Sequence, residues 1–233
     1  MEDYQAIFKR KEIKYLLTQR QLTALMPTLQ RHMEPDAYPH SSILNLYYDT
    51  PDFRLIRRSL EKPEYKEKLR LRSYGVPDGG SSVFPEIKKK ACGIVYKRRV
   101  SMPYRQALAY LAGQAAGEDG QIFREMDWML LCYSGLRARV FLSYERDSWC
   151  GENGLRLTID RDIAFRTHQL DLRHGAGGQM LLPDDMVLME IKIPDAAPLW
   201  LSRALSENGI FPTSFSKYGK AYETICKEEK QYA

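Results

Sequence analysis

The sequence predicts an α+β fold with a mainly antiparallel sheet of seven or eight strands. Several segments alternate charged and apolar side chains, which is the period of a strand whose two faces differ. Neighbouring segments of this kind are joined by short turn-rich connections, which favours hairpins and therefore antiparallel pairing. Helical segments lie between groups of strands rather than after every strand, which is typical of the α+β class.

The N-terminal third combines the alternating pattern of strands with the apolar spacing of a helix. A strand is expected over residues 6–17, and Thr18 with Gln21 forms a capping box that starts a helix. Pro27 is expected to kink this helix. Its apolar positions follow helical spacing at Leu22, Leu25, Met26, Leu29 and Met33.

A strand over 43–50 and a short helix over 51–61 come next. Residues 64–75 and 81–91 predict a hairpin around the sequence VPDGG, and 93–102 predict a third strand beside it.

Helices are then expected at core-like apolar spacing over residues 103–113 and 121–134, packed outside the sheet. The remaining strands are expected over 137–149, 154–165 and 186–194, and the remaining helices over 198–209 and 216–228. Nothing resembles an interdomain linker, so a single domain over residues 1–233 is expected.

Composition places the chain among ordinary globular proteins: 233 residues, 44% hydrophobic and 28% charged, with a net charge of +5. This excess of positive charge is too small to indicate nucleic acid by itself. No signal peptide or transmembrane stretch is apparent, and the four scattered cysteines form no CxxC pair. A cytoplasmic protein with reduced cysteines and no membrane segment is therefore expected.

The basic residues gather on strand faces. In KLRLRSYG, Lys68, Arg70 and Arg72 alternate with Leu69 and Leu71. The same alternation, with cations in the majority, recurs along the other expected strands. Its charged members are Arg10, Glu12, Lys14, Lys66, Lys68, Arg70, Arg72, Glu86, Lys88, Lys90, Arg146, Arg156, Asp160, Glu190 and Lys192.

Two interpretations of these faces stay open. They are the wet side of a one-sided sheet, or they line a chamber inside a sheet curled into a barrel. Rows of like charge repel across neighbouring strands, which favours a chamber that holds a polyanion. In such a chamber Arg and Lys would bind phosphate oxygens, and the few carboxylates would hold a hard divalent cation.

Seven motifs occur in an order that resembles the VTC domain, the catalytic domain of polyphosphate polymerases in the CYTH or triphosphate tunnel metalloenzyme superfamily. The resemblance covers roughly residues 6–226. The motifs are RKEIKY, KLRLRSYG, FPEIKKK, YERDSW, LRLTID, LMEIKIP and FSKYGKA.

The resemblance implies an eight-stranded antiparallel tunnel lined with basic residues, with helices outside and a C-terminal helix near one tunnel end. It implies transfer of the terminal phosphoryl group of ATP to polyphosphate, with Mn or Mg as the divalent metal. Arg70, Arg72 and Lys88 would be the catalytic residues. Glu190, and with it Glu12, would bind the metal. The phosphate-binding set would be Lys14, Arg70, Arg72, Lys88, Tyr144, Arg146 and Lys217.

Two positions depart from the pattern. Arg10 stands where the wider superfamily begins an ExExK motif, and Ser214 stands where a lysine is expected two residues before SK. The loss of a cation at Ser214 favours two alternatives to a polymerase. One is a triphosphatase that hydrolyses inorganic or nucleoside triphosphate, and the other is a non-catalytic module that binds polyphosphate or another polyanion. A nucleic-acid partner is not expected, because aromatic residues do not interleave with the basic rows.

Overall fold

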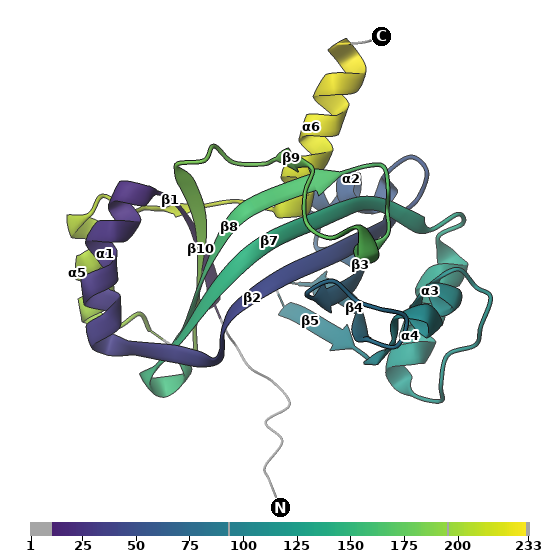
Figure 1. Ribbon diagram of the computed structural model, residues 1–233, viewed down its shortest axis with the longest axis horizontal. Helices are drawn as coiled ribbons and strands as arrows, with labels where there is room; N and C mark the ends of the chain where they lie inside the picture. Colours follow the sequence, from purple (N-terminus) through teal and green to yellow (C-terminus); the bar gives the residue numbers. More distant parts are fainter. Residues whose placement is uncertain (1–10, 93, 195, 232–233) are drawn as a thin grey trace, which may run out of the picture. The chain divides into compact units, whose positions relative to one another are not determined.

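The computed structural model describes residues 11–92, 94–194 and 196–231 (Figure 1). The N-terminal part of the expected first strand, including Arg10, lies outside the described residues. The helices are α1 (Gln19–His32), α2 (Arg54–Leu60), α3 (Tyr104–Leu111), α4 (Gln121–Cys132), α5 (Leu199–Glu207) and α6 (Lys217–Gln231), with short 3-10 turns η1 (Glu152–Gly154) and η2 (Leu172–His174). The long strands are β1 (Lys11–Thr18), β2 (Met33–Asp49), β3 (Tyr65–Tyr74), β4 (Ser82–Ala91), β5 (Ile94–Arg99), β7 (Arg137–Gly151), β8 (Arg156–Arg166) and β10 (Met186–Ile193).

The α+β class with a large antiparallel sheet is confirmed, and the strand count is corrected. Within the described residues the sheet has eleven strands, since β6 (Met102–Pro103), β9 (Gln179–Met180) and β11 (Pro212–Thr213) join the eight long ones. Two-residue strands carry no periodicity, so the sequence pattern could not reveal them.

The closed eight-stranded tunnel is corrected as well. Among the described residues the strand order is β11-β1-β10-β8-β7-β2-β3-β4-β5, which ends at β11 and β5 instead of closing. Both ends have features of edge strands: Pro212 in β11 lacks an N–H, and Lys97 and Arg99 give β5 exposed charge.

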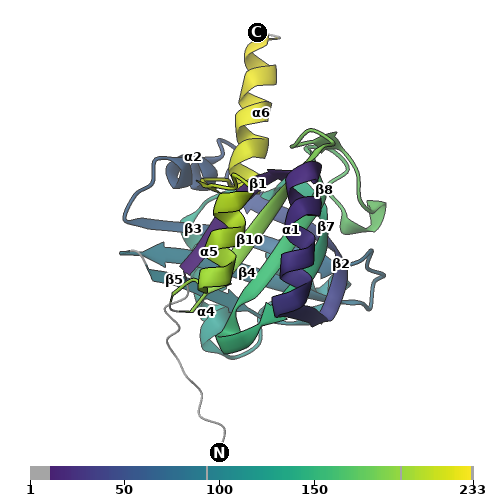
Figure 2. The ribbon, with the colours of Figure 1, turned by 90° about the vertical axis from the view of Figure 1, so that its left-hand side faces the viewer.

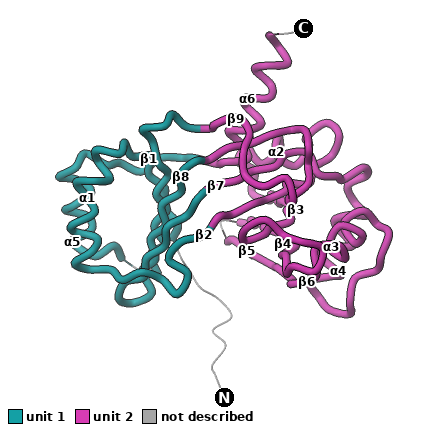
Figure 3. Tube along the Cα trace, in the orientation of Figure 1, with its two compact units in different colours: residues 1–41, 145–162, 182–215 teal, residues 42–144, 163–181, 216–233 magenta. Residues whose placement is uncertain are grey.

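The chain divides into two compact units, shown in Figure 3. Unit 1 comprises residues 1–41, 145–162 and 182–215, and unit 2 comprises residues 42–144, 163–181 and 216–233. The expectation of a single domain over 1–233 stays a prediction. No helix in the described ranges is long and apolar enough to cross a membrane.

In unit 1, α1 and α5 stand side by side against strands β1, β10 and β8 (Figure 2). The predicted capping box is present, with Gln21 N donating to Thr18 Oγ1 at 3.2 Å and Thr18 N donating to Gln21 Oε1 at 3.0 Å. One strand face buries Tyr15, Ile159 and Met189 beneath the helices, together with the apolar face of α1. The opposite face therefore carries the charged alternates.

Unit 2 is built in the same way around β3 and β4. Leu69, Leu71 and Ile87 are fully buried and join the apolar sides of α3 and α4 in one core. Their strand neighbours of opposite parity are mostly cationic. Each unit thus packs one apolar strand face against helices, α1 and α5 in unit 1 and α3 and α4 in unit 2, and carries its charged side chains on the opposite strand face.

Candidate functional site

The charged face of unit 2 follows directly from strand register. Arg70 lies opposite Glu86, Lys68 opposite Lys88 and Lys66 opposite Lys90 in the β3–β4 pair. On the next strand, Lys97 lies opposite Lys88. Residues directly opposite share a face of the sheet. This face of β3, β4 and β5 carries eight cations and one carboxylate: Lys66, Lys68, Arg70, Arg72, Lys88, Lys90, Lys97, Arg99 and Glu86.

The single carboxylate, Glu86, is buried between two of these cations. Its Oε2 accepts from Arg70 Nε at 2.6 Å, and its Oε1 lies 2.9 Å from Lys97 Nζ. Burial raises the pKa of Glu86, but the charges of Arg70, Arg72 and Lys97 outweigh it and lower that pKa to about 2. Burial also opposes the charge of Arg70, yet Tyr47 and Glu86 together raise its pKa. Glu86 thus fixes the orientation of Arg70 in its charged form.

Arg72 is buried, with 6% of its surface exposed, and is held by neutral partners. Its Nε donates to Asn45 Oδ1 at 2.9 Å, and its Nη2 donates to the Tyr144 hydroxyl at 3.1 Å. Asn45 itself donates to Leu142 O at 3.2 Å. Since neither direct side-chain partner is a carboxylate, the charge of Arg72 is positioned rather than neutralised by these contacts.

Tyr47 joins the same face from β2, where it lies opposite Arg70. Its hydroxyl accepts from Arg70 Nη1 at 3.2 Å, and its ring stacks on Tyr218 with centroids 4.4 Å apart. Burial would raise the pKa of Tyr47, but Arg70, Lys68 and Arg72 outweigh burial and lower the pKa to about 8. The lowered pKa shows how positive this part of unit 2 is.

The first turn of α6 brings Lys217 to the charged face of unit 2. Ser216 Oγ accepts from Gly219 N at 3.1 Å, so Ser216 caps the N-terminus of α6. Lys217 Nζ lies 4.5 Å from the ring centroid of Tyr144. Lys68 Nζ, in turn, donates to Ser216 Oγ at 3.4 Å. The start of α6 therefore adds a cation and a capped helix end to the charged face of unit 2.

A buried carboxylate fastens α6 in this position. Tyr218 donates to Asp49 Oδ2 at 2.8 Å, and Asp49 also accepts from the backbone N–H groups of Leu55 and Ile56 at 2.8 and 3.0 Å. Asp49 thereby caps α2, whose own N-cap residue Phe53 makes no side-chain cap hydrogen bond. One side chain joins the end of β2, the start of α2 and the first turn of α6.

Unit 1 has a smaller charged face around Glu190. Lys14 and Glu190 lie directly opposite each other, with Lys14 Nζ 3.1 Å from Glu190 Oε1 and 3.8 Å from Glu12 Oε1. Lys14 Nζ also donates to Phe215 O at 3.0 Å. Glu190 is buried, with 8% of its surface exposed. Lys14 thus stands between the two carboxylates that the family resemblance assigns to a metal.

Arg146 lies on the other side of Glu190 in the same unit. Its Nε and Nη2 donate to the two oxygens of buried Asp160 at 2.6 and 2.8 Å, and Nη2 lies 3.6 Å from Glu190 Oε2. Burial lowers the pKa of nearby Lys192, and Glu12 partly offsets that effect. Arg146 is therefore held by a fork of two hydrogen bonds to one carboxylate.

The donor set of unit 1 suits a divalent cation that arrives with phosphate. No group of three His, Cys, Asp or Glu side chains in the described part of the chain could hold a metal alone. Magnesium keeps several waters and is commonly held by one or two carboxylates together with substrate phosphates. Glu190 and Glu12 match that requirement, and Lys14 forms ion pairs with both.

The predicted site residues fall into two groups, one in each unit. In unit 2, Arg72 and Lys217 both contact Tyr144, and Arg70 and Lys88 lie on the same sheet face as Arg72. Unit 1 places Lys14, Arg146, Glu190 and Glu12 together. The prediction that all nine serve one substrate stays a prediction.

Sequence reasoning missed three partners of these residues: Asn45, Tyr47 and Asp160 in its role of holding Arg146. A signal was present in ILNLYYDT, because Asn is depleted in strands and Asn45 alternates with Leu44 and Leu46. Tyr47 gave no such signal, since tyrosine is common in strand cores.

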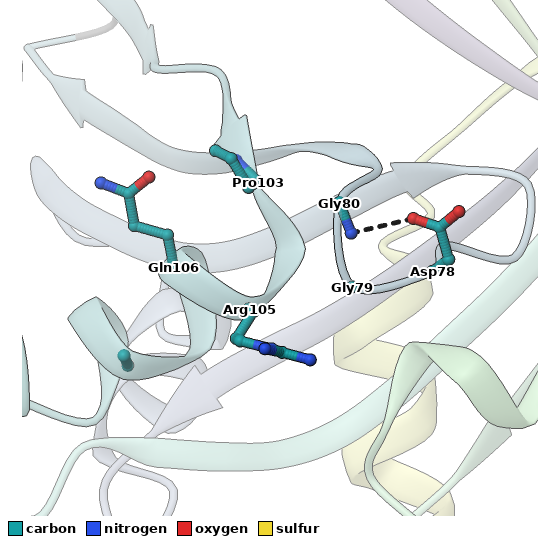
Figure 4. Close-up of a pocket in the computed structure, with 7 residues that line it drawn as sticks. Asp78, Gly79, Gly80, Pro103, Arg105 and Gln106 are labelled. Carbon is teal, nitrogen blue, oxygen red and sulfur yellow. Dashed lines mark hydrogen bonds between the residues drawn. The ribbon is translucent and has the colours of Figure 1, made fainter.

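A surface pocket in unit 2 contains none of the predicted residues. It is lined by the 78–80 turn and the start of α3, including Arg105 and Gln106 (Figure 4). Gly80 N donates to Asp78 Oδ1 at 2.9 Å, so the turn closes on itself. The charged sheet face, rather than this pocket, carries the candidate chemistry.

Comparison with known proteins agrees with the fold. A candidate adenylate cyclase from Bacillus halodurans matches with a TM-score of 0.59 and 15% identity, over 89% of this chain and 95% of that one. A candidate adenylyl cyclase from Hippeastrum, described as having a dominant triphosphatase activity, matches with a TM-score of 0.57 and 17% identity, over 89% and 92%. At these identities the likeness concerns the fold. A search of curated proteins gave no match.

The sequence also matches a family model, over residues 9–226. This match spans nearly the whole chain and confirms the resemblance drawn from the seven motifs. The chain therefore belongs to the VTC domain family.

Proposed function

We propose that the protein is a metal-dependent phosphotransferase that makes inorganic polyphosphate from the terminal phosphate of ATP. The observation that carries this proposal is the charged face of unit 2, which carries eight cations and one carboxylate. Arg70 and Arg72 are held there by Glu86 and Asn45 before any substrate binds. Membership of the VTC family supports a triphosphate as the ligand.

In the proposed reaction, a terminal oxygen of the acceptor chain attacks the γ-phosphorus of ATP. A new P–O bond forms, the bond from the γ-phosphorus to the bridging oxygen breaks, and ADP leaves. The protein contributes alignment and charge neutralisation rather than a covalent nucleophile. Arg70, Arg72 and Lys88 would hold the transferring group, and Lys217 and Tyr144 would contact a neighbouring phosphate.

The unit 1 residues have a separate role in this proposal. Lys14 and Arg146 would bind phosphate oxygens, and Glu190 with Glu12 would hold a divalent cation, manganese or magnesium. That cation would neutralise further charge on the nucleotide. Exchange of Lys14 from Glu190 to phosphate would free carboxylate oxygens for this purpose.

A triphosphatase is the second candidate function, because water in place of the acceptor phosphate gives hydrolysis on the same groups. The Hippeastrum protein of similar fold is described as having a dominant triphosphatase activity. Ser214, in place of an expected lysine, removes one cation that an acceptor chain would contact. A module that binds polyphosphate without turning it over is the third candidate.

One experiment separates the three. Purified protein is incubated with ATP and manganese, and long polyphosphate is separated from free phosphate on a gel. Polymer supports the first function, free phosphate alone supports the second, and binding of polyphosphate without turnover supports the third. The matched variants are Lys88→Ala, expected to lose activity, and Lys89→Ala, which removes the same charge from the opposite strand face and is expected to keep it.

A further inference from the structure

The charged face of unit 2 continues beyond the residues assigned to the triphosphate. Lys66 and Lys90 lie directly opposite each other, one step further along the strands than Lys68 and Lys88. Lys62 stands in the segment that leads into β3, and burial together with Lys90, Lys62 and Lys88 lowers the pKa of Lys66. This group of lysines, Lys62, Lys66 and Lys90, is called the outer lysine cluster below.

Repulsion among the positive charges of the outer lysine cluster destabilises the folded protein. Like charges directly opposite each other on a sheet are destabilising. Neither Lys66 nor Lys90 forms a salt bridge with a carboxylate among the described residues, whereas Lys89, on the other face, binds Glu125 at 3.0 Å. In the part of the chain that the structure describes, Lys66 Nζ donates to a backbone carbonyl alone, Ser59 O, at 3.0 Å. An anion would remove this repulsion.

The length of the row of basic side chains along β3, from Lys66 to Arg72, indicates which kind of anion it could bind. Lys66 and Arg72 are six residues apart on β3, which places them about 20 Å apart along an extended strand. A triphosphate is too short to reach from Arg72 to the outer lysine cluster. A linear chain of more phosphate groups can lie along the whole row, since its charges repeat at regular short intervals.

We propose that the outer lysine cluster binds the phosphate groups of a linear polyphosphate that extend beyond the three held near Arg70 and Arg72. This inference rests on the proposed function for the inner residues. It gives the outer lysine cluster the role of distinguishing a long chain from a triphosphate. A triphosphate contacts the inner residues alone, and a long chain contacts both. Single-stranded nucleic acid is the competing polyanion.

The test compares tripolyphosphate with long-chain polyphosphate by calorimetry, using Lys90→Ala because Lys66 also bonds to Ser59. Lys90→Ala is expected to weaken long-chain binding about tenfold, the loss of roughly one charge-assisted contact, and to leave tripolyphosphate binding unchanged. The salt dependence of long-chain binding should also become shallower by about one unit of slope. The double variant Lys66→Gln with Lys90→Ala should lose more.

Lys89→Ala is the matched control, because it removes the same charge from the adjacent position on the opposite face. Equal weakening of long-chain binding in Lys89→Ala and Lys90→Ala overturns the proposal, since any surface charge then suffices. Unchanged long-chain affinity in Lys90→Ala also overturns it. So does a single-stranded RNA that binds more tightly than polyphosphate and depends on Lys90.

Stability without ligand gives an independent readout. Lys90→Ala removes a like-charge pair and is expected to keep or raise the melting temperature, whereas a structural lysine would lower it. Failure of the proposed function looks different: the wild type would neither polymerise nor hydrolyse ATP, while the dependence of long-chain binding on Lys90 could still be measured.

Discussion

At the scale of single residues, the structure adds a titratable group that the sequence did not indicate. Tyr47 contacts Arg70, and its pKa is lowered to about 8 despite burial. A tyrosinate would compete with phosphate for Arg70. Affinity for tripolyphosphate is therefore expected to fall as pH rises above 8 in the wild type and to stay level in Tyr47→Phe, as measured by calorimetry between pH 7 and about 9.5.

Stability should change in the opposite direction. A group whose folded pKa lies below its unfolded value adds stability as pH rises through the folded pKa, because the unfolded chain then holds more protons. Wild type should gain stability relative to Tyr47→Phe between pH 8 and about 10. Parallel pH profiles of the two proteins in both assays would rule out titration of Tyr47.

A second prediction at this scale concerns Glu190, which is ion-paired with Lys14 and lies near Arg146. If it binds metal, Glu190→Gln should shift the manganese midpoint of ATP consumption upward and lower turnover on the order of a hundredfold. If it is only a counter-ion, the variant should lose stability and keep its metal midpoint. Metal titration beside a thermal melt distinguishes the two roles.

At the scale of elements, the hydrogen bond from Tyr218 to Asp49 holds the start of α6 in unit 2. Tyr218→Phe keeps the stacking on Tyr47 and leaves Asp49 with its backbone donors. The free energy of unfolding should therefore fall by only about 1 kcal/mol. ATP turnover should fall by more than this small loss of stability implies, because the bond also positions the neighbouring residue Lys217, which is proposed to contact phosphate. Denaturant titration and ATP turnover measure the two effects, with Tyr222→Phe as the control; equal losses in both variants would contradict a role for this bond.

At the scale of the whole molecule, a net charge of +5 coexists with a sheet face that carries eight cations and one carboxylate. A ligand that binds the folded state at a hundred times its Kd adds about 2.7 kcal/mol of stability. Tripolyphosphate is therefore expected to raise the melting temperature by several degrees, less at high salt. An equal rise with sodium chloride at matched ionic strength would show that screening alone is responsible.

Much of this architecture was predictable, because the alternation typical of strands and the apolar spacing typical of helices both run through the sequence. The alternation around Arg70 and Arg72 identified β3 and its charged face, and Thr18 with Gln21 identified the start of α1. The two-residue strands and the open strand order were missed, since they depend on pairing between distant segments rather than on local periodicity. Asp160 was recognised as part of a charged face, but its fork to Arg146 depends on how β7 and β8 are placed.

The alternation of faces also limits how the length of this chain can change. In β3, every second residue from Lys66 to Arg72 is cationic, and Leu69 and Leu71 between them are fully buried. Inserting one residue at Lys68 would turn the lysines and arginines on one side of the insertion toward the core and the leucines toward the charged face. Inserting two would restore both faces. Related sequences should therefore differ in length within their loops, or by even numbers within β3, β4 and β10.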